Sequence, residues 1–133
     1  PLDGHVRWVT GRGEHAGTFM QHVQGTIAAT TGSYDDYGLA GFDAATGARR
    51  WTLPADRFRG ATLWRSDDGF LVATADGRVF AIAPQDGTIR WQTAATQTIT
   101  SQIEVADGRA FYYSRPTDER WIGSTLESCR SAR

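Results

Sequence analysis

The sequence predicts an all-β fold made of β-propeller blades, each a sheet of four antiparallel strands, with about three blades in the chain. The first observation behind this prediction is a motif of the form Asp/Thr-Gly-x-x-Arg-Trp, which occurs three times. Its tryptophans lie 43 and 40 residues apart, and its conserved positions are Gly4 and Trp8, Gly47 and Trp51, and Gly87 and Trp91. Repeats of about 40 residues are typical of propellers with four strands per blade. The second observation is the 15 glycines combined with few long apolar runs, which favours a turn-rich β protein.

The unit at residues 59–93 shows the expected strands most clearly. We expect strands at 60–65, 70–74, 78–83 and 88–93, separated by turns rich in Asp and Gly. The Asp76-Gly77 pair is the strongest short-range hairpin signal. The second and third strands are continuous apolar runs, which indicates burial on both faces, as in blades that stack face to face. The fourth strand alternates in polarity, which is typical of an outer strand with one wet face.

The flanking units are less complete. Residues 1–10 are expected to form a single outer strand, residues 17–52 a blade, and residues 98–127 an incomplete blade of three strands, with Trp121 in the third. Three blades do not close a ring, and closure is what protects the edges of propeller sheets. We therefore expect either a piece of a longer propeller or several assembling copies, in which Asp3–Thr10 of one copy completes the last blade of another.

Bulk composition excludes some classes of partner. The formal net charge of −1 argues against a nucleic-acid or anionic-membrane surface, which needs a clustered basic face. No stretch approaches the roughly 20 apolar residues that span a bilayer. The single cysteine, Cys129, cannot form an internal disulfide.

Residues capable of chemistry are present but do not form a recognisable site. His15 and His22, with Glu14 adjacent, lack a third metal ligand in the sequence. Two acidic pairs, Asp35-Asp36 and Asp67-Asp68, carry oxygens suited to calcium, but both lie in turns where Asp is common. No base is placed near Cys129, and the serines lack a nucleophile-elbow sequence. We therefore predict no catalytic residue and no metal ligand.

The tryptophans and the arginines before them have structural interpretations. We interpret Trp8, Trp51 and Trp91 as packing between blades rather than as a platform for stacking a ligand. Each preceding Arg points to the opposite face of its strand. It is expected either to pair with a carboxylate of the adjacent blade or to be solvated.

Two segments, Ala75–Ile82 and Asp43–Trp51, resemble the tryptophan-docking repeats of pyrroloquinoline quinone (PQQ)-type β-propellers, and the resemblance covers roughly residues 2–125. That family contains quinone- and calcium-dependent dehydrogenases as well as scaffolds without catalytic activity, such as an outer-membrane assembly lipoprotein and sensor domains of bacterial kinases. The enzymes carry an adjacent Cys-Cys pair beside the quinone, which a chain with one cysteine lacks. No position of this sequence matches their catalytic Asp.

The expectation from sequence is therefore a scaffold or binding module without catalytic activity or cofactor, which engages a protein or another ligand. The hairpin segment Tyr34, Asp35, Asp36 and Tyr37 is the expected binding loop, because scaffolds present variable loops. Two alternatives remain: a fragment of a PQQ-dependent dehydrogenase that holds PQQ and calcium, and an extracytoplasmic sensor domain of a signalling protein. A periplasmic or cell-surface location is implied by the resemblance alone.

Overall fold

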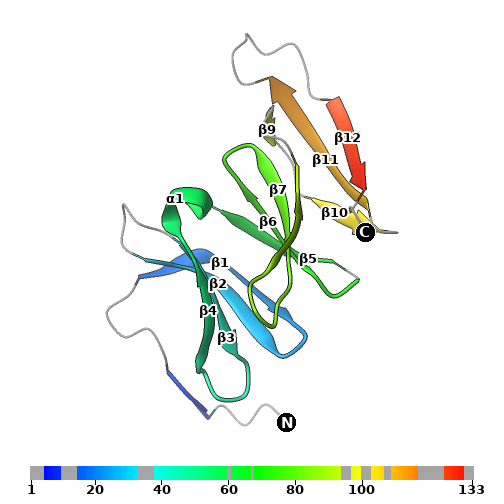
Figure 1. Ribbon diagram of the computed structural model, residues 1–133. Helices are drawn as coiled ribbons and strands as arrows, with labels where there is room; N and C mark the ends of the chain where they lie inside the picture. Colours follow the sequence, from blue (N-terminus) through cyan, green and yellow to red (C-terminus); the bar gives the residue numbers. More distant parts are fainter. Residues whose placement is uncertain are drawn as a thin grey trace.

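The computed structural model describes residues 5–9, 15–32, 38–59, 61–66, 68–93, 97–99, 103–106, 109–116 and 125–130. These residues form three antiparallel sheets that lie side by side (Figure 1). The first sheet contains β1 (His15–Val23), β2 (Thr26–Gly32), β3 (Gly38–Asp43) and β4 (Arg49–Leu53). The middle sheet contains β5 (Thr62–Arg65), β6 (Leu71–Ala75), β7 (Arg78–Ile82) and β8 (Ile89–Gln92). The last sheet contains β9 (Gln97–Ile99), β10 (Glu104–Ala106), β11 (Arg109–Pro116) and β12 (Thr125–Arg130).

The strand order confirms the all-β propeller fold class. In the first and middle sheets each strand pairs with the next one along the chain, in the orders β1-β2-β3-β4 and β5-β6-β7-β8. Both sheets are therefore up-and-down meanders, and the chain passes from the last strand of one to the first strand of the next. A short helix, α1 (Ala55–Phe58), lies in the connection between them. The sequence pattern of this connection did not indicate a helix.

Tight turns join the strands of each sheet. The β6–β7 hairpin turns at Asp76 and Gly77, whose φ angles of 51° and 68° are the pair that a two-residue hairpin turn requires. The hairpin expected from the Asp-Gly sequence is thus present. The third and fourth strands are joined differently, by a wider turn in which Gly47 of the first sheet and Gly87 of the middle sheet adopt φ angles of 73° and 75°.

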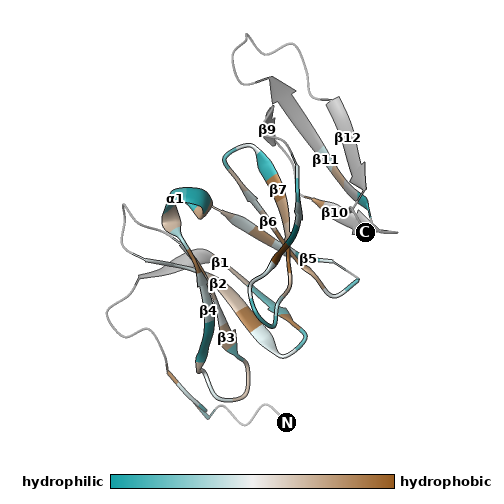
Figure 2. Cartoon of the chain, viewed as in Figure 1, coloured by the Kyte–Doolittle hydropathy of each residue, from teal (hydrophilic) through white to brown (hydrophobic). Residues whose placement is uncertain are grey.

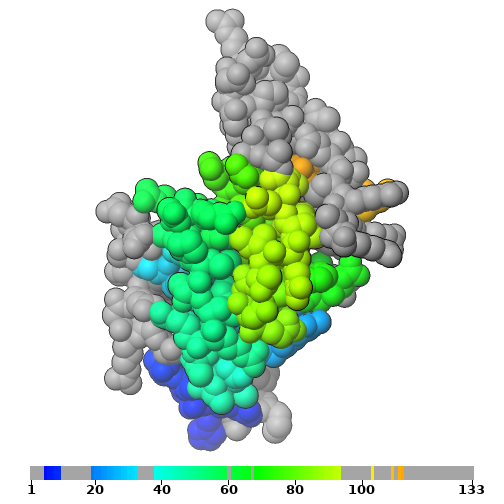
Figure 3. Space-filling model, viewed as in Figure 1, coloured from blue at the N-terminus to red at the C-terminus, as the bar shows by residue number. Residues whose placement is uncertain are grey.

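The core lies between the sheets rather than inside any one of them. Alternate residues of β6 and β7 face opposite neighbours: Leu71 and Phe80 join a cluster with the first sheet, while Val72 and Val79 join a cluster with the last. Both strands are therefore buried on both faces, as their apolar runs predicted, and they carry brown segments in Figure 2. Figure 3 shows the first and middle sheets in continuous contact. The fourth strand β8 alternates between half-buried and exposed residues, as expected of an outer strand.

The last sheet differs in detail from its expected form. We expected three strands in this unit, but the segment before β11 forms two short strands, β9 and β10, which pair with different parts of β11. The strand on the other side of β11 is β12, which begins at Thr125. Trp121, which we placed in the third strand, lies outside the described residues.

Candidate functional site

Trp51 connects the first sheet to the middle sheet. Its side chain is only 8% exposed, and its indole N–H donates a hydrogen bond of 2.7 Å to the carbonyl of Pro84, in the β7–β8 turn. The ring also lies on two glycines. A Cβ on Gly41, its partner on β3, would overlap the indole, and a Cβ on Gly87 would come within 2.9 Å of it. The indole therefore fits only because both positions lack a side chain.

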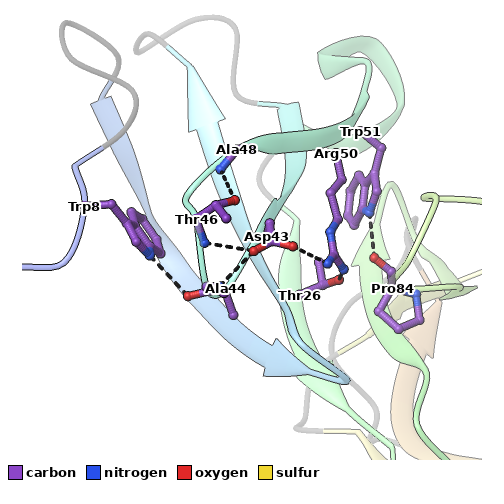
Figure 4. Close-up of polar contacts among 10 residues, drawn as sticks. Trp8, Thr26, Asp43, Ala44, Thr46, Ala48, Arg50, Trp51 and Pro84 are labelled. Atoms are coloured by element: carbon purple, nitrogen blue, oxygen red, sulfur yellow. Dashed lines mark hydrogen bonds and ion pairs between the residues drawn. The ribbon is translucent and has the colours of Figure 1, made fainter.

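Trp8 makes the same kind of contact one repeat earlier (Figure 4). Its indole N–H donates a hydrogen bond of 3.1 Å to the carbonyl of Ala44, in the β3–β4 turn. A Cβ on Gly47 would lie 2.6 Å from the ring. Pro84 and Ala44 occupy corresponding positions in the two turns, as do Gly87 and Gly47. The tryptophan of one repeat therefore packs on the motif glycine of the next.

Trp91 lies at the equivalent position of the middle sheet. It is half-buried and packs against a cluster that contains Val72 and Val79 of the middle sheet and Ile103 and Tyr112 of the last. The remaining motif residue, Gly4, lies outside the described residues.

Hydrogen bonds inside the β3–β4 turn explain the polar residues of the motif. Asp43 accepts hydrogen bonds from the backbone N–H groups of Ala45 and Thr46, at 2.9 and 2.8 Å. The Thr46 hydroxyl in turn accepts the N–H of Ala48 at 3.2 Å. In the β7–β8 turn Asp86 stands where Thr46 stands, and its carboxylate accepts the N–H of Thr88 at 2.9 Å. The first position of the motif therefore accepts either Asp or Thr, because either side chain can accept a hydrogen bond from the N–H two residues later.

The same hydrogen bonds lower the pKa values of both carboxylates. The pKa of Asp43 falls to about 2, mainly through the backbone hydrogen bond from Thr46 and then through the side chain of Arg50. The pKa of Asp86 is also lowered, chiefly by the backbone N–H of Thr88. Both carboxylates hold a turn closed, and this structural role accounts for the shifted pKa values.

Arg50 follows neither of the two expectations for the arginine before each tryptophan. It forms an ion pair with Asp43, which belongs to the same sheet rather than to an adjacent blade. It also donates a hydrogen bond of 2.7 Å to the hydroxyl of Thr26, which is fully buried at the start of β2. The residue therefore ties the β3–β4 turn to the neighbouring strand, because Asp43 lies within reach on the same hairpin.

A concave, charged region of the surface lies at the α1 connection. A cavity of about 400 Å³ is lined there by Asp56, Arg57 and Arg59 of the α1 connection and by Asp76 of the β6–β7 turn. Arg57 is held in place, because it donates a hydrogen bond of 2.7 Å to Gln92 and its guanidinium lies 5.6 Å from the centre of the Phe80 ring. We refer to these four residues as the α1 surface.

The first described residue after the expected binding loop, Gly38, lies beside the α1 connection. Tyr34, Asp35, Asp36 and Tyr37 themselves lie outside the described residues. The strand β3 begins at Gly38, where an added Cβ would lie 2.7 Å from the carbonyl oxygen of Leu53, just before α1. The start of β3 therefore lies beside the beginning of α1. Sequence reasoning missed the α1 surface because Pro54 and the charged residues after it carry no repeat signal.

The other candidate residues do not come together within the described part of the chain. His22 and Asp68 are exposed, and Glu14, Ser33, Asp67 and Ser101 fall outside the description. Nothing is described of the side chains of His15 and Cys129, which lie in β1 and β12. Over the described ranges, no group of three His, Cys, Asp or Glu side chains is placed to hold a metal ion. The helix that is described there is too short to cross a membrane.

Four-stranded antiparallel sheets that repeat along the chain, with the indoles of Trp8 and Trp51 each packed on the turn glycine of the following repeat, define a β-propeller of PQQ-like repeats. The family described as outer membrane protein assembly factor BamB matches residues 1–112, and the chain belongs to this family. Among solved structures, it is similar to the crystal structure of BamB from Moraxella catarrhalis, with 25% sequence identity and a TM-score of 0.48. That match covers 68% of this chain but only 29% of the other, so the chain spans less than a third of the Moraxella protein. The curated proteins contain no match to the sequence.

Proposed function

We propose that this chain is part of a propeller scaffold without catalytic activity, which binds a protein partner through the α1 surface and the neighbouring β2–β3 segment. The observation that carries the proposal is the α1 surface itself. It places two Arg and two Asp around one cavity, on connections between strands whose own residues are committed to packing. Rigid sheets that present polar connections are the usual arrangement of a binding scaffold.

The charges of the α1 surface suit a polar protein segment. Arg57 is fixed by Gln92 and Phe80, so its guanidinium presents a preorganised donor, whereas Arg59 is exposed at the end of the helix. Planar guanidinium groups bind carboxylates in a bidentate manner, and the two Asp provide matching acceptors for a basic group. Membership of a family described as an assembly factor supports a protein rather than a small molecule as the partner.

Site-specific photo-crosslinking in the source cells tests this proposal. A photoreactive residue at position 59 should form a discrete covalent adduct with a second protein. The matched control is position 65, where Arg65 is exposed at the opposite end of β5. Equal adducts at the two positions, or none at position 59, would contradict the proposal.

The loop expected from the sequence is tested in the same assay. Replacing Tyr34 and Tyr37 by Ser should leave folding intact and reduce the adduct formed at position 59. An unchanged adduct would remove the loop from the proposed binding surface while leaving the α1 surface in it.

We further propose an extracytoplasmic location, which the membership of an outer-membrane-related family supports. Fractionation of cells that express the full reading frame tests it, and recovery in the cytoplasmic fraction would contradict it. The proposal includes no resident quinone or calcium ion. A single cysteine cannot supply the adjacent pair that the related enzymes place beside the quinone.

A further inference from the structure

The four charged side chains of the α1 surface form no ion pair in the described part of the chain, although two Arg and two Asp line one cavity. Arg50 and Asp43 show the usual outcome, because an Arg and an Asp within reach of each other pair directly. Charges of opposite sign that line one cavity without pairing keep their hydrogen-bonding capacity for another molecule.

Arg57 is positioned by contacts with uncharged groups. An N–H of its guanidinium donates a hydrogen bond of 2.7 Å to the side-chain oxygen of Gln92, and the group lies 5.6 Å from the centre of the Phe80 ring. Phe80 is fixed in turn, because its ring centre lies 4.9 Å from that of Phe58 in α1 and both residues are almost completely buried. A guanidinium carries several N–H donors in a rigid planar fork. Arg57 therefore keeps its charge and most of its donors in a fixed position.

Asp76 differs from Asp43 and Asp86, the turn carboxylates described above. Those two accept backbone N–H groups of their own turns. Asp76 lies in the β6–β7 turn, where its φ of 51° is the conformation that a two-residue hairpin turn requires. Its carboxylate has no hydrogen-bond partner in the described part of the chain. The Asp76 carboxylate is therefore not needed to close its turn, and it lines the cavity instead.

We propose that the α1 surface takes a partner segment in which an acidic and a basic side chain lie side by side. The acidic group binds at Arg57 and Arg59. The basic group binds at Asp56 and Asp76. This inference rests on the function proposed above and specifies the chemistry of the partner. A segment with acidic groups alone would be repelled by the two Asp, and a segment with basic groups alone would be repelled by the two Arg.

The charge balance favours a segment of mixed charge over a uniformly charged one. The charges that line the cavity cancel, and the formal net charge of the whole chain is only −1. Neither the cavity nor the molecule as a whole therefore produces a strong field of one sign that would attract a polyanion or a polycation. Selectivity has to come from the positions of the individual charged groups.

The experiment titrates the purified chain with three blocked peptides of equal length and follows the backbone amide signals of Arg59 and Gly77 by NMR. The peptides consist of glycine with a central Glu-Lys, Glu-Glu or Lys-Lys pair. The Glu-Lys peptide should bind about fivefold more tightly than either of the others, because each exposed ion pair contributes modestly to affinity. Equal affinities, tightest binding of the Glu-Glu or the Lys-Lys peptide, or no binding of any peptide would overturn the proposal.

Two substitutions that retain the fold test the named contacts. Asp76→Asn keeps the hairpin turn, because Asn-Gly is favoured there as Asp-Gly is, and Arg57→Lys keeps the charge but loses the planar fork. Each should weaken binding of the Glu-Lys peptide about threefold. The matched changes Asp68→Asn and Arg65→Lys, at exposed positions toward the opposite end of β5, should leave binding unchanged. Equal losses in the two sets of variants would contradict the assignment.

The result can be told apart from a failure of the proposed function. A crosslinked adduct at position 59 in cells, without selectivity among the peptides, would retain the binding surface and reject a partner of paired charges. Selective peptide binding without an adduct in cells would retain the chemistry of the cavity and reject the protein partner.

Discussion

The first and middle sheets have the same strand order and the same kind of turn between their third and fourth strands, yet in the described part of the chain only the middle sheet is covered on both faces. Its two faces contact the first and last sheets, so β6 and β7 are buried along most of their length. The first sheet is covered on one face, and its other face leaves Met20 exposed. Burial in this fold is therefore set by the neighbouring sheet and not by the strand sequence alone. The indole contacts show the same contrast, because Trp51 is buried and Trp8 is half-buried.

The largest effect is expected from removing the buried indole. Trp51→Ala should lower the free energy of unfolding by about 3–5 kcal/mol, because it leaves a cavity between two sheets and an unpaired carbonyl on Pro84. Trp8→Ala should lower the free energy of unfolding by clearly less, because Trp8 is half-buried and packs on the β3–β4 turn alone. Urea denaturation of both variants measures the difference. Equal losses would show that the first sheet is as enclosed as the middle one.

A smaller effect is expected at the residue that faces the tryptophan. Gly41→Ala adds a Cβ that overlaps the Trp51 indole, and overpacking of this kind costs roughly 1–3 kcal/mol. The matched change in the middle sheet is Ala81→Gly, which removes a side chain opposite the half-buried Trp91. We expect Ala81→Gly to lower the free energy of unfolding by only about 0.5–1 kcal/mol. If thermal denaturation ranks the two in reverse order, the indole does not pack on Gly41 as described.

Much of this arrangement could be predicted from the sequence, because turn chemistry is local. Asp-Gly pairs fix hairpins through the backbone angles that they tolerate, so the strands of the middle sheet fall close to where we expected them. The division of the first strand of the last sheet into β9 and β10 could not be predicted, since it depends on how two short segments share β11.

The candidate site was harder to predict than the fold. The α1 surface brings together Arg59 and Asp76, which are separated by two strands and a turn, and no periodicity relates them. The pairing of Arg50 with Asp43 was also missed, because it requires knowing how the turn folds back on its own strand. A pattern of apolar and polar residues along the chain does not predict which side chains from different turns come into contact.

The acid response should differ between the two turns. The pKa of Asp43 is lowered from 3.8 to about 2 in the folded protein. Its contribution to stability is therefore fully present above the unfolded value and is lost as the pH falls from about 4 to about 2. Asp43→Asn should flatten the fall of the melting temperature over this range. Asp86→Asn should flatten it less, because among the described residues Arg90 attracts the Asp86 carboxylate without the direct ion pair that Arg50 forms with Asp43. Identical pH profiles for the variant and the unmodified chain would contradict this.

The smallest effect is expected from exchanging the two turn chemistries. Asp86→Thr should leave the melting temperature at neutral pH unchanged, because in the β3–β4 turn the Thr46 hydroxyl accepts the N–H of Ala48, which corresponds to the N–H of Thr88 that Asp86 accepts. Asp86→Ala, which offers no acceptor, should lower it. If the Thr and Ala variants melt together, the side-chain hydrogen bond does not contribute to closing the turn.

Trp51 belongs to the outer strand of the first sheet, whereas Gly87, on which its indole packs, belongs to the middle sheet. The tryptophan of a repeat therefore makes its packing contact with the following repeat and not within its own. Duplication of such a unit does not append an independent module. Each added repeat places one more tryptophan on the turn glycine of a neighbouring repeat, so every duplication adds one packing contact between sheets.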